Sequence, residues 1–409
     1  MLPVIYTAEN HRIDHEKINR DALTVLQTLV DAGYTAYLVG GGVRDLLAGV
    51  TPKDFDVSTD ARPEEIKKLF RRRCILVGRR FRLAHIRFGK HIIEVSTFRA
   101  GDDAERLITQ DNTWGTPEQD VLRRDFTING LYYDPTERCV IDFVGGMEDI
   151  QRHLMRSIGD PVVRFRQDPV RMIRLLKFKA RFGFHVEDSA EAALNECKAE
   201  IVKSAPARIL EEILRMLESG ASKPFFDLMT ENGIMELLIP DLAKYLRSSK
   251  GHRIYRFLEA ADRVCRDQSL ALDRSILCAC LCFPILEDLV EKNFSTEEDS
   301  PNVEQLGELC SDLIRSMMGY SFCNFPKRLR ALTTMIMMWQ YRLTPIHSTQ
   351  KPKNWLVRNQ DSQLALTFLY LRSQVDTDLK RVYAKWHDLY YKAPAVRKRR
   401  RRRSRSKKA

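Results

Sequence analysis

The stretch "LVGGGVRDLLAGVTPKDFDVSTD" (residues 38–60) contains a triple glycine and, starting fourteen residues after Gly40, two aspartates separated by one residue. Asp54 and Asp56 alternate with the apolar residues Phe55 and Val57. Side chains two residues apart in a β-strand point to the same face, so we expect the two carboxylates to project together. Such a pair is either an ordinary polar edge of a sheet or a site that bridges two divalent ions, as two-metal phosphoryl transfer requires.

A third acid, Glu94, lies in the otherwise apolar, strand-like segment "HIIEVSTF" (91–98). An unpaired charge in a buried strand costs free energy, so Glu94 needs a partner. That partner is either a nearby arginine or the pair of metal ions that Asp54 and Asp56 would bind.

The triple glycine at residues 40–42 stands between a strand-like and a helix-like segment. Glycines at such a turn expose backbone N–H groups, and a helix N-terminus favours anions. The pattern is neither the dinucleotide fingerprint GxGxxG nor a Walker loop, because no GK[ST] follows. Together with the nearby aspartates, it is consistent with a cradle for a triphosphate that faces the metal ions.

Length and composition set the broad class. With 409 residues and 44% hydrophobic residues, the chain can bury a sizeable core and form two to four domains. It has no apolar run of the roughly 20 residues needed to span a bilayer, and its start lacks the regions of a signal peptide. We therefore expect a soluble cytoplasmic protein without membrane contact.

Cysteines and histidines give no metal signal. The nine cysteines are scattered, and the C-x-C-x-C run at 278–282 favours buried small hydrophobic residues over a zinc site. His11 and His15 lack the glutamate of an HExxH site, and we predict both at the surface.

The net charge of +12 is concentrated at one end of the chain. The segment "RKRRRRRSRSKK" (397–408) holds ten of the 67 lysines and arginines, which leaves 57 against 55 acidic residues elsewhere. The composition predicts a balanced globular body with a cationic, disordered arm. Such an arm is either a solubilising tail or, as we favour, a segment that binds nucleic-acid phosphates without reading sequence.

Apolar periodicity divides the chain in two. The first 150 residues predict helices over 18–32, 43–49 and 62–72 and strands over 34–40, 55–59, 74–78, 82–89 and 91–98. After residue 160 we expect no strand, because helical spacing recurs over 168–183, 207–219, 222–238, 254–266 and 329–343. Residues 291–302 and 393–395 are expected linkers.

Six motifs in order resemble one known family: "LVGGGVRD" (38–45), "KDFDV" (53–57), "RRDFTIN" (123–129), "DFVGGMEDI" (142–150), "RQDPVRMIR" (166–174) and "ARILEEILRML" (207–217). They are similar to the class II nucleotidyltransferases, a family that contains bacterial poly(A) polymerases and CCA-adding tRNA nucleotidyltransferases. The resemblance extends over nearly the whole chain before the tail.

The resemblance implies an α+β fold class, with a small nucleotidyltransferase α/β head (a mixed sheet with helices) followed by an elongated all-helical neck, body and leg. We expect an N-terminal segment and helix (1–33), the head (34–160), a helical neck with base-recognition and RNA-binding helices (161–222), a helical body (223–305), a C-terminal helical region (306–394) and a disordered Arg-rich tail (395–409).

The resemblance also implies roles for residues of the head. Asp54 and Asp56 would hold two Mg2+ or Mn2+ ions, and Glu94 would be the third catalytic acid. The residues expected to bind the nucleotide and its phosphates are Gly41, Gly42, Arg44, Arg123, Arg124, Asp125 and Asn129.

Base recognition is expected from Asp168, Arg171 and Arg174. On a helix, Asp168 and Arg171 share a face, where a carboxylate and a guanidinium complement the amino donor and ring-nitrogen acceptor of adenine. The same pair suits cytosine, and without the other motifs it would be a surface ion pair. The family usually has Glu at the position of Gln167, which leaves open any role that needs a charge there. Arg208 and Glu211 on the next helix either position the pair or are surface charges.

The segment "LVGRRFRLAHIRFG" (76–89) resembles the signature of the poly(A) polymerases within this family. Its arginines would form a basic cluster beside the active site, or a solvated strand edge. We expect RNA binding by Arg79, Arg80 and Arg82 and, in the tail, by Arg397, Arg400 and Arg403. The helical stripe in 379–391 combines aromatic residues with cations, and we favour a packed core there over an RNA platform.

These observations predict a template-independent poly(A) polymerase that adds AMP from ATP to RNA 3′ ends and releases pyrophosphate. The alternatives are a CCA-adding enzyme that uses CTP and ATP, and a non-catalytic RNA-binding adaptor. The expected partners are ATP, RNA 3′ ends and proteins of RNA degradation or processing, and the chain is expected to be a monomer.

Overall fold

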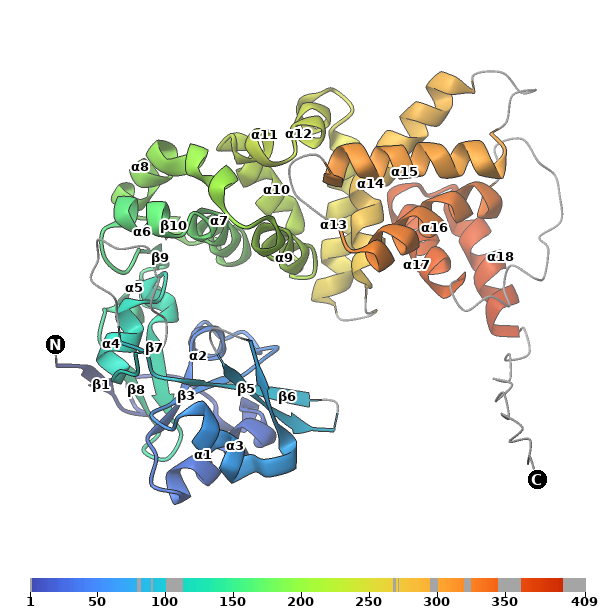
Figure 1. Cartoon of the computed structure of the whole chain (residues 1–409). Coiled ribbons are helices and arrows are strands. Elements are labelled where there is room, and N and C mark those ends of the chain that lie inside the picture. Colours follow the sequence, from blue (N-terminus) through green and yellow to red (C-terminus); the bar gives the residue numbers. More distant parts are fainter. Residues whose placement is uncertain are drawn as a thin grey trace, which may run out of the picture. The chain divides into compact units, whose positions relative to one another are not determined.

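The computed structural model of the chain describes residues 2–78, 82–89, 91–100, 113–267, 270, 272–294, 301–319, 325–344 and 362–392. The chain divides into two compact units, Met1–Ser204 and Ala205–Ala409. The first unit contains all the described strands, and the described part of the second is helical (Figure 1). The finer division into six parts expected from the sequence stays a prediction.

A mixed sheet of eight strands is the centre of the first unit. The strands lie in the order β1 (Val4–Tyr6), β8 (Cys139–Asp142), β7 (Leu131–Asp134), β2 (Ala36–Val39), β3 (Asp56–Thr59), β6 (His91–Thr97), β5 (Leu83–Phe88) and β4 (Cys74–Val77). All neighbours are antiparallel except β3 and β6, which run parallel. The mixed sheet expected for the head is confirmed.

One face of β3, β6 and β5 is covered by helices. Helix α1 (Arg20–Asp31) packs against β2, β3 and β6, and α3 (Pro63–Phe70) packs against β4 and β5 (Figure 1). Val57, Val95 and Ala84 lie side by side across the three strands and are fully buried. Their sequence neighbours point to the opposite face because side chains alternate along a strand.

Helix α1 forms where the apolar spacing predicted it. Ala22, Val25, Leu26 and Leu29 recur at intervals of three and four residues and are buried against the sheet. The Asn19 side chain caps the helix by accepting a hydrogen bond from the backbone of Asp21 (2.7 Å).

The first unit is completed by short elements. These are η1 (His15–Lys17), α2 (Gly41–Leu47), η2 (Arg71–Arg73), α4 (Pro117–Leu122), η3 (Thr127–Asn129), α5 (Gly146–Gln151), β9 (Leu154–Met155), α6 (Pro161–Gln167), α7 (Val170–Phe182), β10 (His185–Val186), α8 (Asp188–Cys197) and η4 (Lys198–Lys203).

Two expectations for this region were wrong in detail. β10 pairs in parallel with β9, so a strand does occur after residue 160; at two residues it is too short to show a periodicity. The helix expected over 168–183 begins only at Val170, and Asp168 lies in the break after α6. Pro169 explains the break, because proline disfavours the helical conformation in the residue before it.

His11 is buried, not at the surface as predicted, with 4% of its area exposed. Its Nε2 donates to the carbonyl of Arg138 (3.0 Å), and its Nδ1 accepts from the backbone of Ile13 (3.2 Å). A histidine whose two nitrogens both find partners can be buried without a large cost. His15 is only partly buried.

The second unit consists of helices α9 (Pro206–Leu217), α10 (Ser222–Glu231), α11 (Ile234–Leu238), α12 (Pro240–Arg247), α13 (His252–Arg266), α14 (Arg274–Asn293), α15 (Val303–Gly319), α16 (Lys327–Leu343), α17 (Ser362–Val375) and α18 (Leu379–Lys392). Segment 222–238 forms two helices, because Gly233 interrupts it with a φ of 73°. Cys278, Cys280 and Cys282 of α14 are buried, as predicted.

The aromatic stripe of α18 packs into a core, as favoured from the sequence. Trp386 is 5% exposed and clusters with Trp339, Leu343 and Leu369. Its indole N–H donates to the carbonyl of Leu343 (2.9 Å).

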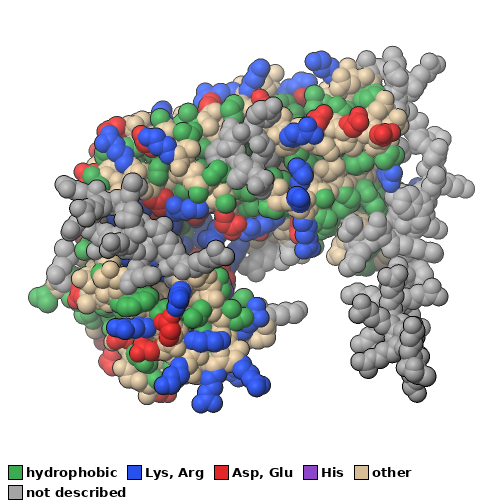
Figure 2. Space-filling model, viewed as in Figure 1, with side chains coloured by type: hydrophobic (Ala, Val, Ile, Leu, Met, Phe, Trp, Pro, Cys, Tyr) green, Lys and Arg blue, Asp and Glu red, His purple; other side chains and the backbone are tan. Residues whose placement is uncertain are grey.

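Cationic and anionic side chains are interspersed on the face of the molecule seen in Figure 2, in keeping with the nearly neutral body. Among the described residues, no helix combines the length and the apolar character needed to cross a bilayer.

Candidate active site

Asp56 and Glu94 lie opposite each other on neighbouring parallel strands. His85 on β5 is in turn opposite Glu94, so the three side chains form a row across β3, β6 and β5 on the face away from Val57 and Val95. His85 Nε2 lies 3.3 Å from Glu94 Oε2, and the Glu94 side chain is 42% exposed. Glu94 thus contacts a histidine, which the sequence did not suggest, and its side chain is less buried than the apolar strand pattern predicted.

Asp54 lies just before β3, which begins at Asp56, so strand alternation does not fix the relation of the two carboxylates. Both aspartates are exposed. The segment lies directly against the glycine turn, because a Cβ atom on Gly42 would be 3.3 Å from the carbonyl oxygen of Asp54 and from the ring of Phe55. The motifs "GGG" (40–42) and "KDFD" (53–56), which are close in the sequence, are thus also close in space.

Two guanidinium groups lie on another side of the glycine turn. Gly40 has a φ of 63°, which favours glycine, and a Cβ atom there would be 3.2 Å from an Arg124 nitrogen. A Cβ atom on Gly41 would be 3.5 Å from an Arg44 nitrogen. The turn is therefore bordered by two cations and by the aspartate segment.

Arg44 is buried on α2 and is held on several sides. It donates to Asp45 Oδ1 through Nε (2.9 Å) and a terminal nitrogen (2.6 Å), and to Asn129 Oδ1 (2.6 Å). The rings of Phe178 and Phe182 stack on its guanidinium, with centroids 4.7 and 4.9 Å away. Burial lowers its pKa, although the charge of Asp45 acts in the opposite direction.

Asp45 also binds α7. Its Oδ2 accepts from Arg181 at 2.7 Å, so one buried carboxylate joins Arg44 of α2 to an arginine that lies 136 residues after Asp45 in the chain. Burial makes such a pair costly to break, because removal of one partner leaves the other charge uncompensated.

Asp125 of the "RRDFTIN" motif is 5% exposed. Its Oδ1 accepts from the Asn129 side chain and the Phe126 backbone, both at 2.9 Å, and its Oδ2 lies 2.9 Å from Arg174. Burial alone would raise the pKa of Asp125, but Arg174 and these hydrogen bonds outweigh it, so the pKa falls below its usual value of 3.8. Asp125 therefore stays ionised and ties the motif to α7.

Arg124 is oriented by Asp120 and Tyr132. Asp120 Oδ2 accepts from Arg124 and from the Tyr132 hydroxyl, each at 3.0 Å, and the Tyr132 ring lies 5.2 Å from the guanidinium carbon. Burial alone would lower the pKa of Arg124, but Tyr132 and Asp120 raise it above its usual value.

Arginines of helices α6 and α7 donate hydrogen bonds to the backbone at the start of the "RRDFTIN" motif (123–129). Arg171 donates to the Arg123 carbonyl (3.0 Å), and Arg164 donates to the carbonyls of Leu122 (3.0 Å) and Arg124 (2.7 Å). Burial, aided by the charge of Arg171, lowers the pKa of Arg164 to about 10. Two further arginines thus lie against the backbone beside Arg123 and Arg124.

The residues expected to read the base do not share one helix. Asp168 lies in the break between α6 and α7, and its carbonyl accepts from the backbone of Arg171 (3.0 Å). Arg174 is bound to Asp125, and Gln167 accepts from Arg164 (3.3 Å). Glu211, in the second unit, forms ion pairs with Arg274 and Arg215.

Of the residues predicted to bind RNA, the structure describes only Arg82. Arg82 is exposed and forms an ion pair with Glu64. Arg79, Arg80, Arg397, Arg400 and Arg403 lie outside the described residues.

The donor set at the acids fits divalent ions of the Mg2+ type. Asp54, Asp56 and Glu94 offer carboxylate oxygens, which these ions prefer. Within the described residues no three His, Cys, Asp or Glu side chains are grouped closely enough to enclose a metal ion. Mg2+ commonly binds through one or two carboxylates and completes its shell with substrate phosphates and water.

Sequence reasoning missed the residues that hold the site together, namely Asp45, His85, Asp120, Arg164 and Arg181. Only Asp45 carried a signal, as the acid next to Arg44 in the glycine motif. The others become visible only when the fold brings distant segments together.

Comparison with known families matches residues 36–156 to the "Poly A polymerase head domain" and residues 183–246 to the "Probable RNA and SrmB- binding site of polymerase A". The chain is 36% identical to poly(A) polymerase I of Salmonella typhimurium over 417 residues, which cover 96% of this chain and 87% of that protein. A CCA-adding enzyme of Lactobacillus helveticus is also 36% identical, but over 224 residues, or 54% of this chain and 55% of that enzyme.

Among solved structures, the CCA-adding enzyme of Bacillus stearothermophilus in complex with CTP has a TM-score of 0.61. The match covers 91% of this chain and 82% of that enzyme, at 23% sequence identity. This likeness shows that the two chains share a fold.

Proposed function

The chain belongs to the poly(A) polymerase family of class II nucleotidyltransferases, and from that premise we propose that it adds AMP from ATP to RNA 3′ ends without a template. The observation that carries this function is the extent of its similarity to poly(A) polymerase I, which covers 96% of the chain. The similarity to the CCA-adding relative covers 54%. The enzyme is accordingly a polynucleotide adenylyltransferase.

In the proposed reaction, the terminal hydroxyl of RNA attacks the α-phosphorus of ATP in line, the bond between the α- and β-phosphates breaks, and pyrophosphate leaves. Asp54 and Asp56 are the proposed ligands of two divalent ions, Mg2+ or Mn2+, and Glu94 is the proposed third acid. Ions bound there would lower the pKa of the attacking hydroxyl and neutralise charge on the phosphates.

The proposed triphosphate site is the glycine turn with Arg123 and Arg124. The backbone of Gly41 and Gly42 can approach phosphates closely because no side chain intervenes. Arg44 and Asp125 are buried and bonded to internal partners, whereas Arg123 and Arg124 are partly exposed, so we assign the first two to the support of this site. Asn129 binds both and joins them.

The proposed base site is Asp168 with Arg171. A carboxylate beside a guanidinium complements the amino group and ring nitrogen of adenine, and guanine presents the reverse polarity. Arg171 also donates a hydrogen bond to the backbone carbonyl of Arg123. This bond links the proposed base site to the proposed triphosphate site. A cytoplasmic location, a monomeric state and partners in RNA degradation or processing complete the proposal.

Incubation of the purified protein with a generic RNA primer and either ATP alone or CTP alone tests the function. We expect long adenylate tails from ATP and little incorporation from CTP. Incorporation of CTP into tRNA that lacks its CCA end, without long tails from ATP, would identify a CCA-adding enzyme. No incorporation from either nucleotide, with RNA binding intact, would identify a non-catalytic adaptor.

A further inference from the structure

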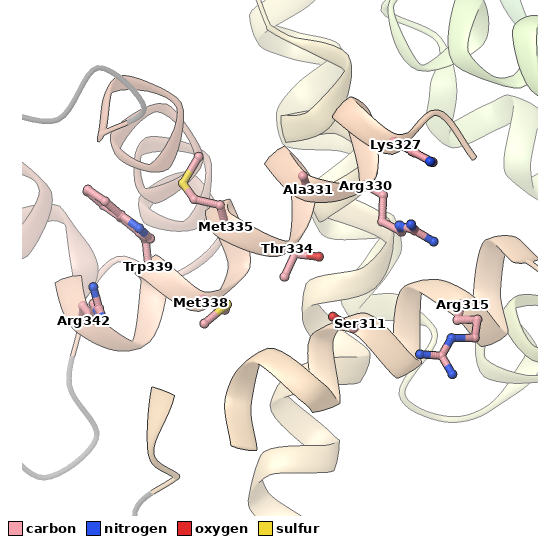
Figure 3. Close-up of a pocket in the computed structure, with 10 residues that line it drawn as sticks. All are labelled: Ser311, Arg315, Lys327, Arg330, Ala331, Thr334, Met335, Met338, Trp339 and Arg342. Atoms are coloured by element: carbon pink, nitrogen blue, oxygen red, sulfur yellow. The ribbon is translucent and has the colours of Figure 1, made fainter. Parts of the chain in front are cut away.

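We propose that a cationic groove between α15 and α16, in the second unit, binds single-stranded RNA. The proposal rests on the proposed function, because it takes RNA as the substrate to be held. The groove has a volume of about 640 Å3. It is lined by Ser311 and Arg315 of α15 and by Lys327, Arg330, Ala331, Thr334, Met335, Met338, Trp339 and Arg342 of α16 (Figure 3).

The charge of the groove has one sign. Four of the described lining residues are cations and none is an acid. Arg315 forms an ion pair with Asp312 (3.1 Å), but both side chains are about two-thirds exposed (67% and 68%), so the pair is weak. An incoming phosphate can replace Asp312 at low cost.

The spacing of the cations favours a polymer over a compact anion. Lys327 and Arg342 are fifteen residues apart on one helix, which corresponds to roughly 22 Å. In Figure 3, Lys327, Arg330 and Arg315 lie toward one end of the groove and Arg342 toward the other. A single phosphate cannot reach both ends, whereas a strand with a charge on every nucleotide can.

The middle of the groove is apolar, which favours RNA over an acidic peptide. Met335 and Met338 are partly buried. They lie beside Thr334, between Arg342 at one end of the groove and the other three cations at the opposite end (Figure 3). Met338 faces Gly307 of α15, where an added Cβ atom would be in ordinary van der Waals contact with Met338 Cε (3.5 Å), and Trp339 belongs to the core. RNA can place its bases on the polarisable thioether side chains while its backbone follows the cations, whereas a purely acidic peptide such as polyglutamate has no apolar side chains to place there.

Lys327→Ala combined with Arg330→Ala tests the groove in the full-length enzyme. Both residues are exposed at the start of α16, so the variant should fold, and its unfolding midpoint checks this. We expect the Kd for a labelled oligoadenylate of about fifteen nucleotides to rise roughly tenfold at about 100 mM salt. The slope of log K against log salt should fall by about 1.4, or about 0.7 for each lost phosphate contact.

Two variants serve as matched controls. Arg263→Ala combined with Lys292→Ala removes the same charge from exposed positions of the second unit outside the groove and outside residues 183–246, and should leave both quantities unchanged. The exchange Lys327→Arg with Arg330→Lys keeps the charge and should restore affinity.

Equal RNA affinity in the Lys327/Arg330 variant and the unmutated enzyme would overturn the proposal. So would a loss of affinity for a polyglutamate peptide with RNA affinity retained, because the groove would then bind an acidic protein segment. The proposed function is judged separately, by adenylate addition in the unmutated enzyme.

Discussion

At the scale of single residues, the carboxylate of Asp56 is exposed at the first position of β3, in register with Glu94. We predict that Asp56→Asn abolishes extension of an RNA primer, because the change removes a proposed metal ligand but almost no volume. The free energy of unfolding should change by less than about 0.5 kcal/mol, as is usual for exposed positions. Primer extension with ATP, RNA binding and urea denaturation measure the three effects.

The matched control is Glu137→Gln, which removes an exposed carboxylate at the turn between β7 and β8. It should leave extension intact. Polymerisation retained by Asp56→Asn would contradict the proposed mechanism, and a large loss of stability would mean that the residue has a structural role instead.

The lowered pKa of Asp125 should make the free energy of unfolding depend on pH. Its pKa in the folded chain lies below the usual 3.8, so its contribution to stability is complete above that value and is lost as the pH falls through the folded pKa. Asp125→Asn should cost about 2 kcal/mol at neutral pH, because Arg174 loses a buried partner but is itself partly exposed.

Denaturation curves at neutral pH and at a series of values below about 4 measure this effect. The unmutated chain should lose more stability over the acidic range than Asp125→Asn, so that the two curves converge. Parallel curves would show that Asp125 does not contribute to the acid sensitivity.

At the scale of helices and strands, α18 provides a test of packing against RNA binding. Trp386 is 5% exposed and bonded to the Leu343 carbonyl, so we predict that Trp386→Ala costs about 3–5 kcal/mol of unfolding free energy. Its exposed neighbour Lys385 provides the control, and Lys385→Ala should cost less than about 0.5 kcal/mol. If Trp386→Ala instead weakened RNA binding without a loss of stability, the helix would be an RNA platform.

The strands and helices around the site were predictable where the pattern is local. Apolar periodicity located α1, α3 and the strands from β2 to β6 within a few residues, because each has one face on the core. It failed at Asp168, because the strong helical spacing of 170–182 concealed the effect of Pro169. β10 has only two residues and depends on its partner β9.

Asp54, Asp56 and the glycine turn stand out in the sequence because they lie within one short segment. The contacts that support them were not, since they join segments far apart. Asp45 meets Arg181 136 residues away, and Arg171 meets the Arg123 backbone 48 residues away. The burial of His11 likewise depends on the carbonyl of Arg138, 127 residues later.

At the scale of the whole chain, the basic residues fall into two groups, those clustered in the tail and those balanced by acidic residues elsewhere. Ten lie in residues 397–408, outside the described part, and the others are nearly balanced by acids. The groove between α15 and α16 is an exception within the balanced body, because its four cations have no acid among the described lining residues. If both bind RNA, each should contribute its own share of the salt dependence, since phosphate contacts add.

We therefore predict that removal of residues 395–409 weakens RNA binding in a salt-dependent way. Each lost phosphate contact should reduce the slope of log K against log salt by about 0.7, and the difference from the full chain should shrink as salt increases. A tail with every Lys and Arg changed to Gln controls for length, and it should behave like the deletion because only charge is involved. Fluorescence anisotropy with a labelled oligoadenylate measures both. Combination of the deletion with Lys327→Ala and Arg330→Ala should reduce the slope by the sum of the separate effects, and a smaller reduction would mean that tail and groove compete for the same phosphates.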